Sequence, residues 1–300
     1  MIPKVDIRQS ENWAEYLHSL NWNSHKTSSG VNIEYIKSFL GGIVKIQRPA
    51  LFDKKDLAEI ETFCKGIKPL FIKIEPYVGQ NVGVLEEFGY IRSDIPMVPP
   101  STIYIDLTRS EEELWTNISH GAKYSVKWAQ KESITLRFYQ NPLKEKLELY
   151  FQMVQETGRR KHFYTQPYKD MLSKVKIWGK ECHMVLAYDK EGNLLSGKFF
   201  LCYGDTVLYS SGGTTKRGLG SKGGYEPMWK SILYFKGLGY KVMDLEGKDD
   251  ERFPSVTGNW GGFSYFKESF GGEVVEFPYP YIKYISPILK FMGKFGKLPL

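Results

Sequence analysis

Hydrophobic positions in the first part of the chain change their period in a way that predicts alternating strands and helices. Apolar residues alternate with polar ones from residue 31 and residues 43–46 are strand-like, which predicts two strands separated by glycines. From Asp53 to Gly66 the spacing becomes three and four, which predicts a helix capped by Asp53. Its apolar stripe is Leu57, Ile60 and Cys64. Further strands are predicted at 70–74 and 102–107, with a short helix at 84–88 between them.

Residues 110–131 predict one long basic helix. Ser110 and Glu113 have the spacing of a capping box at its start. Gly121 weakens the prediction by about 1 kcal/mol relative to alanine. The apolar face would hold Leu114, Ile118, Ala122, Val126 and Ala129, and the lysines outside that face are Lys123, Lys127 and Lys131.

The strand and helix pattern starts again near residue 134 and runs to about residue 277. A strand at 134–139 precedes a helix around Leu147, and a second helix is expected around Ile232 after a glycine-rich loop at 212–224. Strands are also predicted at 183–188, 194–203, 206–209, 241–245 and 273–277. Such alternation favours an α/β or mixed α+β fold. At 300 residues the prior is two domains, and the restart places their boundary near 135.

The composition limits the kinds of partner and site that we expect for this protein. The net charge is +7, which favours nucleic acid, phosphate-bearing substrates or an acidic membrane face without choosing among them. The cysteines Cys64, Cys182 and Cys202 are scattered and form no CxxC or Cys/His cluster, so we expect neither a metal site nor a disulfide framework. The sequence has no apolar run of about 18 residues and no signal-peptide pattern near residue 1, which favours a cytoplasmic location.

Several segments between about residues 100 and 277 form a set of motifs. The strand T-I-Y-I-D-L at 102–107 is followed by the basic helix with Lys123 and Lys127. The second half has Y-S-S-G-G at 209–213, Y-E-P-M-W at 225–229 and G-Y-K-V-M-D-L-E-G at 239–247. The segment G-F-S-Y-F-K-E-S-F-G at 262–271 has the pattern G-x-x-x-F-K-x-x-F-G. Together these segments resemble the FemABX family of peptidoglycan-bridge aminoacyltransferases, which has that last pattern as a signature and usually has arginine at the positions of Lys123 and Lys127.

The resemblance implies two tandem GNAT-like domains. These would be residues 1–135, completed by a returning segment at 277–300, and residues 136–276. It also implies transfer of an amino acid from aminoacyl-tRNA to the stem-peptide amine of a peptidoglycan precursor, either lipid-linked or UDP-linked. A monomer without a cofactor is expected.

The family resemblance also implies candidate catalytic and acceptor-binding residues. Lys267, with its neighbour Phe266, would stabilise charge developing on the transferred ester; the alternative is a surface lysine in a loop. Arg160 and Tyr164 have the spacing of contacts to the precursor's phosphates, where a guanidinium donates two parallel hydrogen bonds. Cations that complement a helix C-terminus are an equal alternative for them. Tyr209 would line the same channel or be an ordinary sheet tyrosine, and Asp106 ends the T-x-x-I-D-L strand as a further substrate-binding candidate.

Basic residues in two other places suggest phosphate binding. Lys123 and Lys127 would contact the tRNA backbone, which requires only cations, although a solvated helix face explains them equally well. Lys216, Arg217 and Lys222 belong to a segment that partly resembles the R-x-x-G-x-G/A phosphate loop of acyl-CoA-dependent GNAT enzymes. That segment supports an alternative function, an acyl-CoA-dependent N-acyltransferase. A third alternative is a basic binding protein of the same fold without catalysis.

The last residues predict an amphipathic helix that would suit an anionic membrane surface. Packing of this helix against the first domain is the alternative. Its apolar side would hold Ile288, Phe291, Met292 and Phe295, and its basic side Lys290, Lys294 and Lys297.

Overall fold

The structure is a computed structural model that describes residues 1–38, 41–293 and 298. Two compact units are present, and each draws on separate parts of the chain. Unit 1 comprises Met1–Ile2, Thr102–Glu246 and Gly262–Val274. Unit 2 comprises Pro3–Ser101, Gly247–Gly261 and Val275–Leu300.

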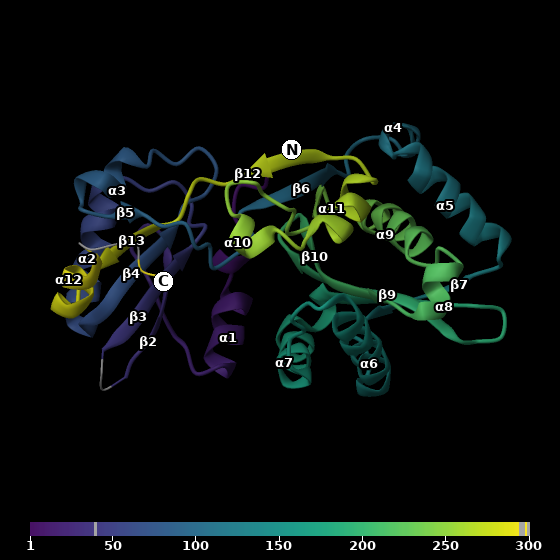
Figure 1. The fold of residues 1–300 in the computed structure, drawn as a ribbon, viewed down its shortest axis with the longest axis horizontal. Coiled ribbons are helices and arrows are strands. Elements are labelled where there is room, and N and C mark those ends of the chain that lie inside the picture. The colour runs from purple at the N-terminus through teal and green to yellow at the C-terminus, as the bar shows by residue number, and fades with distance from the viewer. Residues whose placement is uncertain (39–40, 294–297, 299–300) are drawn as a thin grey trace. The chain divides into compact units, whose positions relative to one another are not determined.

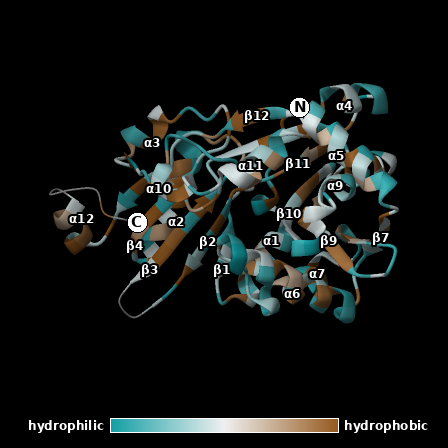
Figure 2. Cartoon of the chain, turned by 45° about the vertical axis from the view of Figure 1, so that its right-hand side comes forward, coloured by the Kyte–Doolittle hydropathy of each residue, from teal (hydrophilic) through white to brown (hydrophobic). Residues whose placement is uncertain are grey.

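Unit 2 is built on a mixed six-stranded sheet in the order β1-β2-β3-β4-β13-β5. Its strands β3 and β4 pair in parallel and are coloured as largely hydrophobic in Figure 2. Ile33, Val44, Ile46 and Ile74 from this sheet are fully buried, together with the predicted stripe of α2. The strands are β1 Asn23–Lys26, β2 Asn32–Ile36, β3 Gly42–Gln47, β4 Pro69–Glu75, β5 Ile91–Arg92 and β13 Tyr281–Tyr284. The helices are η1 Ile7–Gln9, α1 Glu11–Ser19, α2 Lys54–Ile67, α3 Gly83–Glu87, α10 Pro254–Thr257 and α12 Pro287–Gly293.

The C-terminal segment returns to the sheet formed by the N-terminal strands. β13 lies between β4 and β5, with Tyr281 opposite both Ile74 and Arg92. The following helix α12 exposes Ile288, Phe291 and Met292. Lys294, Phe295 and Lys297 of the expected amphipathic helix lie outside the described residues.

Unit 1 is built on a mixed seven-stranded sheet in the order β12-β6-β11-β10-β9-β8-β7. Helices α5 and α9 pack together on one face, and α6 and α7 lie on the other (Figure 1). The strands are β6 Ser101–Asp106, β7 Thr135–Gln140, β8 Cys182–Tyr188, β9 Leu194–Tyr203, β10 Thr206–Thr214, β11 Val242–Asp244 and β12 Glu273–Glu276. The helices are α4 Glu111–Asn117, α5 His120–Lys131, α6 Lys144–Lys161, α7 Tyr168–Trp178, η2 Gly179–Glu181, α8 Lys216–Gly220, α9 Tyr225–Gly237 and α11 Gly261–Glu268.

The predicted fold class is confirmed, because both units are mixed α/β structures. The division between the units differs from the boundary expected near residue 135. β6 pairs with β11, so that Asp106 lies opposite Val242, and this pairing joins residues 102–106 to the sheet of the second half. The restart at residue 134 is therefore a new strand of the same sheet.

The single helix expected at 110–131 is two helices. Ile118 is extended, with ψ 142°, and ends α4. The Ser119 hydroxyl then accepts a hydrogen bond from the Ala122 amide and caps α5. The predicted apolar face is nevertheless buried from Leu114 to Ala129. Two serines therefore begin two helices on one continuous hydrophobic stripe. Among the described residues, no helix is long and apolar enough to cross a bilayer.

Candidate active site

Lys267 lies on helix α11 of unit 1, and its side chain is buried. The alternative of an exposed lysine in a loop is therefore wrong. Lys267 Nζ donates a hydrogen bond to the carbonyl oxygen of Glu246, which follows β11. Burial lowers the pKa of Lys267 to about 8, against the opposing charges of Glu246 and Asp244. This ammonium is held in place, and its proton is more easily lost than that of an exposed lysine.

Aromatic rings surround Lys267. Its Nζ lies 4.8 Å from the ring centre of Phe263 and 5.8 Å from that of Tyr209. Phe266, the neighbour in the F-K motif, packs edge-on against Tyr225 and Phe270 at 5.1 Å and 5.2 Å between ring centres. Such a low-dielectric environment strengthens electrostatic interactions with any charge that forms nearby. We call Lys198, Tyr209, Phe263, Phe266 and Lys267 the lysine–aromatic cluster.

Tyr209 is held by an irregularity in β10. The register with β9 shifts between Tyr209 and Ser211, so Ser210 is an extra residue in the strand. The Tyr209 hydroxyl lies 2.0 Å from the position that a Cβ of Gly212 would occupy. Only glycine at 212 therefore leaves room for this ring orientation. Burial raises the pKa of Tyr209 above its ordinary range, so its phenol stays protonated.

Lys198 is a member of the cluster that the sequence analysis missed. It lies on β9 opposite Gly212, is 3% exposed, and makes no hydrogen bond or ion pair that the described residues show. Its Nζ lies 4.8 Å from the ring centre of Phe266 and 5.8 Å from that of Tyr209. Burial, and then the charge of Lys267, lowers the pKa of Lys198 to about 7. Strand alternation was the available signal, because it places Lys198 on the same inward face as Phe200.

Arg160 points to the end of β10, on the α6 face of the sheet. Its Nη2 donates to the carbonyl oxygen of Thr214, so it does not cap the C-terminal carbonyls of its own helix. Its Nε and Nη1 are buried without a hydrogen-bond partner, and Glu156 is 3.9 Å from Nη1. Two nitrogens of the guanidinium thus have no hydrogen-bond acceptor among the described residues. Tyr164, by contrast, is 80% exposed beyond the end of α6.

Asp106 has a local structural role at the end of β6. Its Oδ1 accepts hydrogen bonds from the amide and the hydroxyl of Thr108, at 3.0 Å and 2.6 Å. Arg109 lies 3.9 Å from its other oxygen. These contacts form a turn between β6 and α4, and they use the carboxylate that was expected to bind substrate.

The segment expected to form a phosphate loop is largely helical. Residues Lys216–Gly220 form α8, and Arg217 is paired with Asp189 at 2.6 Å and Glu191 at 2.7 Å. A Cβ at Gly218 would lie 2.1 Å from the carbonyl oxygen of Leu195, so packing against β9 explains this glycine. Lys216 is exposed. The arrangement leaves Arg217 neutralised by two carboxylates.

Helix α5 presents cations and aromatic rings on its exposed side. Tyr124 and Trp128 are 51% and 39% exposed, with their ring centres 6.1 Å apart. Lys222 lies 4.2 Å from the ring centre of Tyr124. Lys123 Nζ donates to the carbonyl oxygen of Thr116 at 2.9 Å, which leaves Lys127 as the more exposed of the two lysines proposed to contact RNA.

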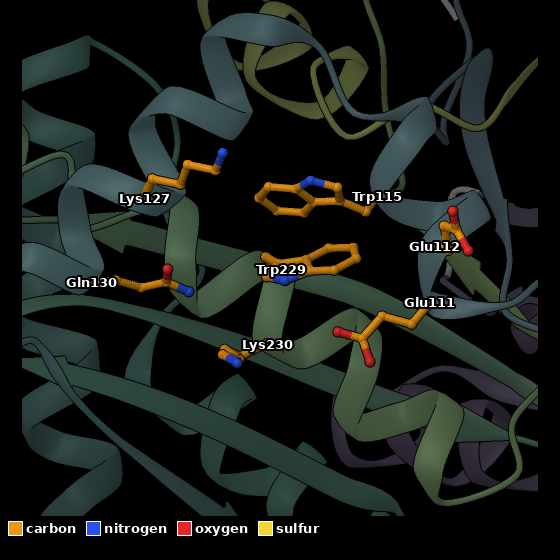
Figure 3. A pocket seen from close by; sticks show the side chains of 7 residues that line it. All are labelled: Glu111, Glu112, Trp115, Lys127, Gln130, Trp229 and Lys230. Carbon is orange, nitrogen blue, oxygen red and sulfur yellow. The ribbon is translucent and has the colours of Figure 1, made fainter.

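Lys127 also lines a pocket of about 440 Å³ between α4, α5 and α9. Trp115 and Trp229 lie one above the other in Figure 3, with ring centres 5.0 Å apart. The other lining residues are Glu111, Glu112, Gln130 and Lys230. The pocket therefore combines an aromatic wall with charges of both signs.

Comparison with known proteins identifies solved structures with a similar fold. No family model and no curated protein sequence matches the chain. The solved structure of FemX matches with a TM-score of 0.80 and 16% identity, covering 97% of this chain and 94% of FemX. L-PGS from Bacillus licheniformis matches with a TM-score of 0.61 and 14% identity, covering 92% of this chain and 89% of that one. A C-terminal domain assigned to a lysylphosphatidylglycerol synthetase of Agrobacterium fabrum also has a TM-score of 0.61, with 11% identity and coverage of 96% and 92%.

The resemblance to the FemABX family that the motifs predicted is thus confirmed at the level of fold. The chain has the fold of FemX over almost its whole length. A proposed function has to account for three features: the lysine–aromatic cluster, the half-buried Arg160 and the exposed face of α5.

Proposed function

We propose that this protein is an aminoacyltransferase that uses aminoacyl-tRNA as donor and adds the amino acid to the stem-peptide amine of a peptidoglycan precursor. The observation that carries the proposal is the position of Lys267. The lysine of the F-K motif is buried among aromatic rings, in a chain with the fold of FemX.

Aminoacyl transfer requires an amine nucleophile, an activated ester and a group that stabilises the tetrahedral oxyanion. The tRNA ester is already reactive, so positioning and electrostatics supply most of the catalysis. In the proposed role the ammonium of Lys267 faces the ester carbonyl oxygen and stabilises its developing negative charge. Phe263 and Phe266 keep the environment apolar, which makes this stabilisation larger than it would be in water.

Arg160 is the proposed contact to the acceptor's phosphates. Its Nε and Nη1 have no hydrogen-bond partner while Nη2 is fixed on Thr214, so the guanidinium is oriented before a ligand arrives. Nε and Nη1 donate from different edges of the guanidinium, so each would meet a separate phosphate oxygen. Tyr164 lies nearby in sequence and is exposed, so any contact with the acceptor would form on binding.

The donor tRNA is proposed to contact α5. Exposed Tyr124 and Trp128 offer rings on which unpaired bases stack, and Lys127 with Lys222 offers cations for the backbone. This combination tolerates any base sequence, as expected for an enzyme that reads the acceptor end mainly through its shape and charge.

A cytoplasmic location with peripheral attachment to the inner face of the cell membrane completes the proposal. The exposed apolar residues of α12 and its Lys290 suit an anionic leaflet. Such attachment would bring the enzyme to a lipid-linked acceptor.

Two other acyl transfers remain as alternatives. An acyl-CoA donor would need the segment 216–222 to cradle a pyrophosphate, whereas Arg217 is paired with Asp189 and Glu191. Phosphatidylglycerol would be the acceptor if the shared fold with the lysylphosphatidylglycerol synthetase domain extended to its substrate.

The experiment that tests the proposal offers the purified protein three donor and acceptor combinations. These are charged tRNA with a soluble UDP-linked precursor, acyl-CoA with the same precursor, and charged tRNA with phosphatidylglycerol vesicles. Mass spectrometry of the acceptor reads the result. We expect an adduct of one amino-acid mass in the first combination, and an adduct only in the second or third would contradict the proposal.

A further inference from the structure

We propose that Lys198 is a second catalytic residue of the site, the base that takes a proton from the acceptor ammonium before it attacks the ester. This inference rests on the proposed function and adds to it a residue that no family motif marks. The observation behind it is that the Lys198 amine is buried without a polar partner among the described residues and lies close enough to Lys267 to be affected by its charge.

Lys198 and Lys267 approach the ring of Tyr209 from different elements. Lys198 comes from β9 and Lys267 from α11, and both Nζ atoms lie 5.8 Å from the ring centre of Tyr209. The ring centre of Phe266 lies 4.8 Å from Lys198 Nζ, and that of Phe263 lies at the same distance from Lys267 Nζ. The charge of Lys267 also acts on Lys198, so an amine that attacks a carbonyl held by Lys267 would come close to Lys198.

The polar partners of the two lysines differ. Lys267 donates to Glu246 and has Asp244 nearby, so carboxylates and a carbonyl favour its charged form. The charged group that faces Lys198 is Lys267, which disfavours a second ammonium, and the rings of Tyr209 and Phe266 offer Lys198 only cation–π contacts at 5.8 Å and 4.8 Å. Gly224 lies beside Lys198 at the start of α9, where the helix dipole is positive and also disfavours a cation.

This difference assigns different tasks to two identical side chains. Lys198, whose pKa is lowered to about 7 by burial and by the charge of Lys267, loses its proton more readily than Lys267, whose charged form is favoured by Glu246 and Asp244. Titratable pairs whose environments push their pKa values apart are the usual acid and base of an active site. Because the two charges interact, the pair titrates in two coupled steps.

The proposed step balances as follows. The neutral amine of Lys198 takes one proton from the acceptor ammonium, which becomes a neutral amine. Its nitrogen lone pair forms the new C–N bond, and the carbonyl electrons move to the oxygen that faces Lys267. When the C–O bond to the ribose breaks, the second proton of the attacking nitrogen goes to the leaving ribose oxygen. Lys198 then releases its proton to solvent, so the net products are the amide, the free tRNA hydroxyl and one proton.

The first test compares Lys198→Met with the wild-type protein in single-turnover transfer from charged tRNA across pH 6 to 9. Methionine keeps the length of the side chain but cannot titrate. General base catalysis contributes about 100- to 10,000-fold, so we expect a rate loss of at least about 100-fold at pH 7.5. The wild-type rate should rise as pH increases through about 7, and this acidic limb should be missing from the variant. Lys198→Met that keeps the wild-type rate and the acidic limb would overturn the proposal.

Chemical rescue separates a base from a structural or ligand-binding lysine. In Lys198→Ala, added methylamine should restore part of the rate, with an effect that follows the neutral fraction of the amine. A cooperative thermal unfolding transition shows that the variant folds. A folded variant that gains no rate from methylamine, and whose only defect is a raised KM for charged tRNA, would show instead that Lys198 is a phosphate contact and would overturn the proposal.

A measurement on the protein without substrate distinguishes failure of this inference from failure of the proposed function. The ¹³Cε resonance of Lys198, assigned by its loss in Lys198→Met, should titrate near neutrality in the wild-type protein. If wild-type protein transfers amino acid while this resonance stays that of an ammonium up to pH 9, the base is another group and only this inference fails. If no donor and acceptor pair gives product, both the proposed function and the role of Lys198 fall.

Discussion

Lys267 Nζ donates a hydrogen bond to the carbonyl oxygen of Glu246, a non-glycine residue whose backbone has φ 41°. This left-handed conformation is uncommon for a glutamate and is found where surrounding structure imposes it. The Glu246 amide is held in turn by the Asp244 carboxylate at 2.8 Å. The backbone after β11 is thus shaped so that one carbonyl receives the buried ammonium of α11.

The first prediction concerns the size of the Lys267 contribution. An ammonium aimed at the ester oxygen stabilises charge that exists only in the transition state, so it affects kcat more than binding. Lys267→Ala should reduce kcat about 100- to 1,000-fold and leave both KM values within a few-fold. Lys267→Arg should rescue poorly, because a planar fork places its charge elsewhere. Glu268→Ala, at the exposed neighbouring position, is the control and should be nearly silent; a folded Lys267→Ala that keeps most of its kcat would remove Lys267 from the mechanism.

The second prediction concerns pH. In the proposed role Lys267 acts in its protonated form, and its pKa is lowered to about 8, so kcat should fall as pH rises through about 8. Lys267→Met should lack this basic limb within its residual activity. A wild-type rate that stays constant to pH 9.5, measured in single turnover with correction for spontaneous ester hydrolysis, would show that the charge of Lys267 is not required.

The third prediction concerns stability and needs no substrate. The pKa of Lys198 is lowered in the folded state, so between about 7 and its ordinary value near 10.5 the unfolded chain binds more protons than the native protein. The free energy of unfolding should therefore rise with pH across this window. Lys198→Met should be more stable than the wild type at pH 7, by on the order of a few kcal/mol, and the difference should shrink at pH 10. Urea unfolding at both pH values measures the difference in the free energy of unfolding. A variant less stable than the wild type at pH 7 would contradict the claim that burying Lys198 destabilises the folded protein.

The fourth prediction concerns Arg160. Arg160→Lys keeps the charge but loses the two donors without partners, Nε and Nη1. The KM for the phosphate-bearing acceptor should rise about tenfold, as expected for loss of about 1.4 kcal/mol, while the KM for charged tRNA barely changes. Arg159→Lys, at the neighbouring exposed position, is the matched control. An unchanged acceptor KM would assign Arg160 to holding the end of β10 at Thr214.

The fifth prediction concerns the proposed contact between α5 and tRNA. The logarithm of the tRNA binding constant should fall linearly with the logarithm of salt concentration, and each lost phosphate contact should reduce that slope by about 0.7 to 0.9. Lys127→Ala should therefore give a shallower slope. Tyr124→Ala should weaken binding but leave the slope unchanged. Lys180→Ala, which removes a lysine on the η2 turn before β8, is the control for net charge. Equal slopes for Lys127→Ala and Lys180→Ala would leave α5 as a solvated helix face.

The sixth prediction concerns the exposed helix α12. Ile288→Glu with Met292→Glu should reduce binding to anionic vesicles and leave transfer to a soluble acceptor largely intact, because both side chains face solvent. Deletion of residues 287–300 should have the same effect. Sedimentation with vesicles and thermal melting together decide the question. A large loss of melting temperature with unchanged vesicle binding would mean that this segment packs within unit 2.

Local patterns predicted most of the elements but not the way they combine. Hydrophobic spacing correctly predicted α2, β3, β4, β9 and the buried face from Leu114 to Ala129, because each depends on neighbours in sequence. The break at Ser119 could have been predicted, since a serine followed by a helical stripe is a capping signal. The inclusion of β6 in the sheet of the second half, in place of a boundary near residue 135, could not have been predicted. It depends on the pairing of β6 with β11, more than a hundred residues away.

The candidate site was predicted in part for the same reason. The F-K motif singled out Lys267, and strand alternation places Lys198 on the same face of β9 as Phe200, but the approach of both lysines to Tyr209 depends on how β9, β10 and α11 pack. Arg217 and Asp106 looked available in sequence, yet their partners Asp189, Glu191 and Thr108 become visible only once β8, β9 and the β6–α4 turn are in place.

The most direct test of the central claim is single-turnover formation of the amide from radiolabelled aminoacyl-tRNA and a soluble UDP-linked stem-peptide precursor. We predict that label moves from tRNA to the precursor with wild-type protein, that acyl-CoA does not replace the tRNA, and that Lys267→Ala slows the transfer about 100- to 1,000-fold at saturating substrates. Label that remains on the tRNA at every protein concentration, or transfer that proceeds equally well with Lys267→Ala, would contradict the account.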